Sequence, residues 1–72
     1  MTNKQIETIL TRAIETAYSK QSEEISKKLG AVEDAVQSAI DGIDYNEVKG
    51  MTEKEVYNFY YGWALGCIAS VL

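Results

Sequence analysis

The chain lacks histidine and proline, and it has a single cysteine, Cys67. One cysteine cannot close an intrachain disulfide, and without histidine the usual zinc ligand sets are missing. Nucleophilic catalysis would need a carboxylate or a lysine as its base, and no motif surrounds either type of residue here. We therefore expect no catalytic residue, no metal site and no cofactor, and we predict that the protein is not an enzyme.

Positive charge is also scarce. Seven Lys and Arg stand against eleven Asp and Glu, which gives a net charge of −4. Nucleic-acid binding needs clustered cations, so we expect no nucleic-acid partner. Seven of the carboxylates lie in residues 33–55. This stretch is expected to be a solvated face or to meet a basic protein groove, with a loop of exposed side chains as the partner contacts: Asp41, Asp44, Tyr45 and Glu47.

Signals for secretion are missing as well. The first residues are polar, the following apolar residues have a helical rhythm, and no disulfide framework is present. These features favour a cytoplasmic protein.

The small size limits the core. We predict one helical domain over residues 1–72, because a chain of this length has no room for a second core. A single core of this size rarely supplies more than about 3–5 kcal/mol, and small domains gain further stability from disulfides, metals, oligomerisation or very good helix packing. Only the last two are open to this chain.

The N-terminal half has the pattern of an amphipathic helix. Thr2 and Gln5 form a predicted capping box, and apolar residues then recur every three or four positions. The predicted helix covers about 2–29, and a second covers about 31–41. Gly30 follows two lysines as a helix end would, yet the apolar stripe keeps its phase, so one long helix bent at Gly30 stays open. We favour a break or bend.

Glycines at 42 and 50 bound a predicted loop over 42–51. Thr52 and Glu55 form a second capping box, which predicts a final helix over 52–72. The fold class is therefore all-α, a small bundle of two or three helices.

The final helix carries no formal charge from Asn58 to Leu72. Its main apolar stripe is expected to face the core, and the opposite side is apolar too, which requires burial all round. The main stripe is Val56, Phe59, Tyr60, Trp63, Ala64, Cys67, Ile68, Val71 and Leu72. The second side consists of Tyr57, Tyr61 and Leu65 beside a ridge of Gly62, Gly66 and Ser70.

Three burial schemes compete for this helix. A membrane anchor would need about 20 apolar residues, and the fourteen from Phe59 to Leu72 are too short. A monomeric bundle could cover the helix with the two preceding ones. We favour self-association, usually as a homo-oligomer, because aromatic residues are enriched in interface cores. The predicted interface residues are Tyr57, Tyr61, Gly62, Trp63, Leu65 and Gly66.

The functional hypothesis is a non-enzymatic helical protein that self-associates and binds another macromolecule, most simply a second protein. Short length, acidity and the missing catalytic set are features that a small phage or mobile-element accessory or inhibitor protein would show. One alternative is an oligomer that sequesters a nucleotide or another small ligand, with a tyrosine on the base and Lys20, Lys27 or Lys28 on phosphate. A second alternative is membrane association through the C-terminal helix.

Overall fold

Helices make up all the regular structure of this protein. A computed structural model describes all 72 residues and contains no strand, which confirms the all-α fold class. The helices are α1 (Asn3–Ser19), α2 (Glu23–Leu29), α3 (Val32–Asp41), α4 (Tyr45–Val48) and α5 (Glu53–Ala69).

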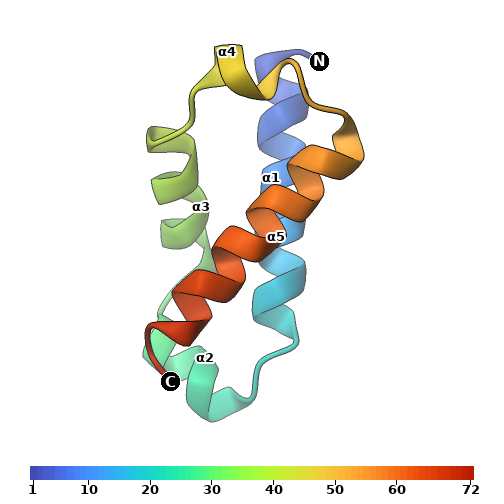
Figure 1. Cartoon of the computed structure of the whole chain (residues 1–72). Coiled ribbons are helices and arrows are strands. Elements are labelled where there is room, and N and C mark those ends of the chain that lie inside the picture. Colours follow the sequence, from blue (N-terminus) through green and yellow to red (C-terminus); the bar gives the residue numbers. More distant parts are fainter.

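The helices α1 and α5 form the centre of the fold and cross along most of their length (Figure 1). The core on α1 follows the predicted spacing of three and four residues, and on α5 every fourth residue is buried. These buried residues are Ile6, Ile9, Leu10, Ala13, Ile14 and Ala17 on α1, and Val56, Tyr60, Ala64 and Ile68 on α5.

The short helices cover the sides and ends of this pair. Helix α3 packs beside α1, α2 lies near the C-terminal end of α5, and α4 joins α3 to α5 near the N-terminus (Figure 1). Ala39 of α3 and Val48 of α4 complete the buried core. The molecule is elongated, with extents of 37 × 20 × 17 Å.

Both predicted capping boxes are confirmed. The Thr2 hydroxyl accepts from the Gln5 N–H at 3.1 Å, and the Gln5 side chain accepts from the Thr2 N–H at 2.8 Å. Thr52 and Glu55 make the same pair of hydrogen bonds at the start of α5. The bond from Thr52 N–H lowers the pKa of the Glu55 carboxyl, because it favours the charged form.

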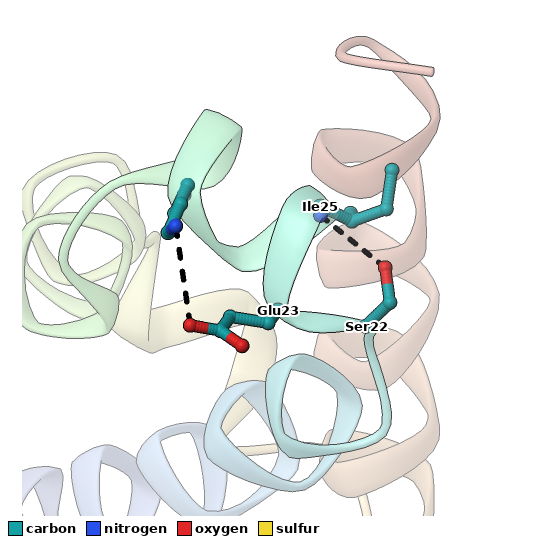
Figure 2. A network of polar contacts seen from close by, with 4 residues as sticks. Ser22, Glu23 and Ile25 are labelled. Atoms are coloured by element: carbon teal, nitrogen blue, oxygen red, sulfur yellow. Dashed lines mark hydrogen bonds and ion pairs between the residues drawn. The ribbon is translucent and has the colours of Figure 1, made fainter.

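The predicted continuous helix over 2–29 is wrong, since the chain breaks between Ser19 and Glu23. Figure 2 shows the reason: the Ser22 hydroxyl accepts from the Ile25 N–H at 3.3 Å and caps a new helix. Two glutamates follow Ser22 in the first turn, where the helix dipole favours negative charge. The sequence thus contained the signal, a serine before paired acidic residues, although the apolar pattern continued across it.

The predicted break at Gly30 is confirmed. Gly30 has φ 79° and ψ −158°, a region that only glycine occupies readily. Helix α3 starts after Ala31, which provides no side-chain cap. The backbone conformation of Gly30 therefore separates α2 from α3.

The remaining boundaries differ in detail. The predicted loop over 42–51 contains the single turn of α4, and α5 ends at Ala69 rather than at residue 72. The structure has five helices where two or three were expected, because Ser22 caps a helix that divides the first one and Asp44 caps an extra turn. No helix combines the length and apolar character needed to cross a membrane.

Candidate functional site

The most distinctive surface is the side of α5 that faces away from α1. We call it the outer face of α5, and it consists of the exposed residues Asn58, Phe59, Gly62, Leu65, Gly66 and Ala69. Phe59 is 55% exposed and Leu65 is 44% exposed, which is high for large apolar side chains. A methyl group built on Gly62 or Gly66 would meet no atom of the chain within 4 Å. The two glycines therefore form an open ridge between large side chains.

The prediction that Phe59 and Leu72 face the core is wrong, since both are exposed. Burial on α5 advances strictly by four residues, from Val56 to Ile68. That row drifts around the helix and leaves Phe59 at the edge of the outer face, with its ring edge-on to Tyr60 at 5.0 Å between centroids. Leu72 lies beyond the end of α5.

Tyr57 and Tyr61 occupy the flank of α5 that meets α1. Their rings stack with centroids 6.1 Å apart, and a charged side chain of α1 lies over each ring. The Arg12 guanidinium lies 5.6 Å from the Tyr57 centroid, and the Lys20 ammonium lies 5.3 Å from the Tyr61 centroid. We call these four residues the cation–tyrosine strip.

A hydrogen bond reinforces one end of this strip. Lys20 Nζ donates to the Tyr61 hydroxyl at 3.1 Å. That bond and the charge interaction with Tyr61 raise the pKa of Lys20, so the ammonium keeps its charge. Sequence reasoning grouped Lys20 with Lys27 and Lys28, but only Lys20 meets a tyrosine. Lys27 instead lies 3.9 Å from Glu23 on the exposed surface of α2.

The predicted interface set thus divides in two. Gly62, Leu65 and Gly66 are exposed on the outer face, whereas Tyr57, Tyr61 and Trp63 are half-buried. Half-burial follows from their positions on the flanks of the helix, beside the core row. Sequence reasoning missed Phe59 as an outer-face residue because an i, i+3 spacing also fits a core stripe.

On the opposite flank of α5, Cys67 is half-buried near Tyr18 of α1. Burial, followed by the interaction with Cys67, raises the pKa of the Tyr18 hydroxyl. Both groups belong to the packing between α1 and α5.

The predicted partner contacts of the acidic loop have roles within the chain. Asp44 caps α4 by accepting from the N–H groups of Asn46 and Glu47 at 3.1 and 3.4 Å. Asp41 accepts a bond from Gln37 at 2.8 Å. Of the three predicted carboxylates, only that of Glu47 accepts no hydrogen bond, and Glu47 is exposed.

Tyr45 was predicted to be exposed, and this is wrong. The ring is half-buried, and its hydroxyl donates to Glu7 Oε2 of α1 at 2.5 Å. This bond is the main cause that raises the pKa of Tyr45 to about 12, because ionisation would place two negative charges side by side. Tyr45 therefore fastens α4 to α1.

A small hollow of about 150 Å³ lies beside α4. Its walls are mostly apolar, and its polar lining includes two carboxylates. The lining residues are Gly42, Ile43, Asp44, Glu47, Val48, Met51, Phe59 and Tyr60. Phe59 thus connects this hollow to the outer face of α5.

No three side chains of Cys, Asp or Glu come together in a way that could hold a metal ion. No family of known proteins, no curated protein and no solved structure matches this chain. The functional argument therefore depends on the residues themselves.

Proposed function

We propose that this protein is a non-enzymatic, cytoplasmic interaction protein that self-associates through the outer face of α5 and acts by binding another protein. One observation carries the proposal. An uncharged helix face leaves Phe59 and Leu65 in solvent on either side of two unoccupied glycines. Exposed apolar side chains are common singly, but a continuous apolar strip marks an interaction site.

A second copy of the chain suits this face. In a two-fold arrangement the same patch lies on both partners, so Phe59 and Leu65 of one copy can lie over Gly62 and Gly66 of the other. The small residues allow the helices to approach closely, at the short end of the usual range of about 8–10 Å between axes. The net charge of −4 opposes association of like molecules, and the charge-free stretch from Asn58 onward keeps that repulsion away from the contact.

The size of the face indicates a weak dimer. Helix α5 has 17 residues and is therefore about 25 Å long, and a helix is about 10 Å wide. Such a strip is smaller than the roughly 800 Å² per partner of a standard interface. We expect a dimer whose population depends on concentration in the micromolar range.

The hollow beside α4 is the proposed contact for the second protein. Its apolar walls and the exposed Glu47 carboxylate suit a lysine or arginine, whose aliphatic stem can pack while its charged head stays near the carboxylate. A basic partner surface of this kind is what a small phage or mobile-element inhibitor would engage.

Light scattering after size exclusion, over a range of concentrations, tests the self-association. We expect the mass to rise from 8.0 kDa toward twice that value, and we expect Gly62→Leu to remain monomeric with its helix content kept. Ser26→Leu on exposed α2 is the matched control, because it adds the same side chain away from the face. Wild-type protein that stays monomeric at every concentration contradicts the proposal, and so does a Gly62→Leu variant that assembles like the control.

A further inference from the structure

Helix α1 presents a row of cations and hydroxyls beside α5. Every fourth residue belongs to it, in the order Lys4, Thr8, Arg12, Thr16 and Lys20. The spacing of four places neighbouring members on adjacent turns, so Arg12 and Lys20 are about 12 Å apart along the axis. Thr8 and Thr16 donate to backbone carbonyls of their own helix at 2.9 and 2.7 Å, and their oxygens can still accept.

Lys4, Arg12 and Lys20 form no ion pair with a carboxylate, although Glu7 and Glu15 line the same side of α1 as Lys4 and Arg12 and the chain carries four more negative charges than positive ones. The only ion pair in the structure is the one between Lys27 and Glu23. Arg12 and Lys20 are held instead by the rings of Tyr57 and Tyr61. A ring face positions a cation without using up its N–H donors, and Lys20 spends one of its three donors on the Tyr61 hydroxyl.

A shallow groove continues from this strip toward the N-terminus of α1. It measures about 400 Å³ and is lined by Thr2, Lys4, Gln5, Thr8, Ile9, Arg12 and Glu53. Lysine, arginine and hydroxyl groups are the side chains that bind phosphate oxygens. Ile9 supplies one apolar contact, and Glu53 is the only carboxylate in the groove.

From this arrangement we propose that the cation–tyrosine strip and its groove bind a nucleoside polyphosphate. The base stacks on the Arg12 guanidinium, whose other side faces Tyr57, and the phosphates extend along α1 to Lys20, about 12 Å further along the axis. Arg12 is exposed, so that stacking surface is open to solvent. Each chain carries the whole site, and the inference is therefore independent of self-association.

The net charge of the chain favours a free nucleotide over a nucleic-acid strand as the ligand of this site. A long strand would pass the acidic residues that surround the strip, because the remainder of the chain is more negative than the strip is positive. A free nucleotide is short enough to stay beside Arg12 and Lys20, and carboxylates further from it than a Debye length of about 8 Å are largely screened. The small ligand is the occupant that this charge distribution favours.

Titration calorimetry with ATP at low ionic strength, without metal, tests the inference. We expect Arg12→Gln with Lys20→Gln to weaken ATP binding at least about tenfold, since the first removes the stacking cation and the second removes a charge-assisted hydrogen bond. The matched control is Lys27→Gln with Lys28→Gln, which removes the same charge from α2, and we expect its affinity to stay within about twofold. Tyr61→Phe keeps the ring and removes only the acceptor of Lys20, so we expect a loss of about threefold.

Two further probes identify the ligand class. Inorganic triphosphate is expected to bind more weakly than ATP, because it has no base to stack. A short single-stranded oligonucleotide of mixed sequence is also expected to bind more weakly than ATP, per site. Absence of ATP binding up to about 1 mM overturns the inference. An equal loss of ATP affinity in the two double variants also overturns it. So does triphosphate, or the oligonucleotide, binding as tightly as ATP.

Discussion

A hydrogen bond between two side chains holds α4 against α1. The Tyr45 hydroxyl reaches a carboxylate that lies 38 positions earlier in the chain, in Glu7. No local pattern predicts such a pair, because sequence periodicity reports which face a residue lies on and not what the facing helix offers there. The same limit explains Phe59, whose exposure depends on the direction in which α5 crosses α1.

The Tyr45–Glu7 bond gives the stability a specific pH dependence. Folding raises the pKa of Tyr45 from 10.0 to about 12, so the neutral hydroxyl is the form that the fold favours. Its contribution is complete below about pH 10 and disappears as the pH rises toward about 12. We expect the difference in free energy of unfolding between wild type and Tyr45→Phe to shrink over that range.

Urea unfolding across this alkaline range, starting from neutral pH, measures the difference. Tyr57→Phe is the matched control, because the Tyr57 hydroxyl makes no hydrogen bond in the structure. Burial also raises the pKa values of Tyr18 and Tyr60. Tyr18 affects wild type and both variants alike, and the charge of Tyr60 is the smallest of the causes that raise the pKa of Tyr45. A Tyr45→Phe difference that is constant with pH would show that the bond to Glu7 is not formed in solution.

At the scale of helices, the boundaries are set by local chemistry. Capping boxes at Thr2 and Thr52 start α1 and α5, and these starts were predicted because every participant lies within a few residues. The division between α2 and α3 depends on Gly30 in the same local way. The break at Ser22 was missed because a capping serine competes with a continuing apolar pattern, and only the packing of α2 near the end of α5 decides between them.

Gly30 provides a direct test of this division. Alanine at this position would be forced into a backbone region that costs about 1–3 kcal/mol. We expect Gly30→Ala to lower the free energy of unfolding by that amount, measured by urea unfolding. Gly50→Ala is the control: it has no positive φ and its added methyl would make only ordinary contact, so a small effect is expected. Equal effects at the two positions would mean that the Gly30 conformation is not required.

At the scale of the whole molecule, the fold leaves one apolar surface uncovered. Helix α5 is covered by α1 on one side and flanked by α2, while its outer face remains open (Figure 1). A core of 12 buried residues is small, and association would add buried apolar area to it. Assembly and stability are therefore expected to be coupled.

This coupling makes the melting temperature depend on concentration. A dimer of folded chains stabilises the folded state by mass action, so we expect the wild-type melting temperature to rise as protein concentration increases. The Gly62→Leu variant should melt at a temperature independent of concentration. Calorimetric scans over a range of about a hundredfold in concentration make the comparison. A wild-type curve that does not shift would argue that the outer face stays in solvent.

Local residue patterns predict the helical class, both capping boxes, the break at Gly30 and most of the core of α1, because each follows from residues near one another along the chain. The sequence also shows that α5 is apolar on more than the one side that a core would cover. Two features depend on how α1 and α5 pack together: the side of α5 that stays exposed, and the placement of Arg12 and Lys20 over the rings of Tyr57 and Tyr61. The reason is physical: these features depend on the angle and rotation at which two helices pack, and the angle is fixed by core side chains of α1 and α5 that are far apart in the sequence.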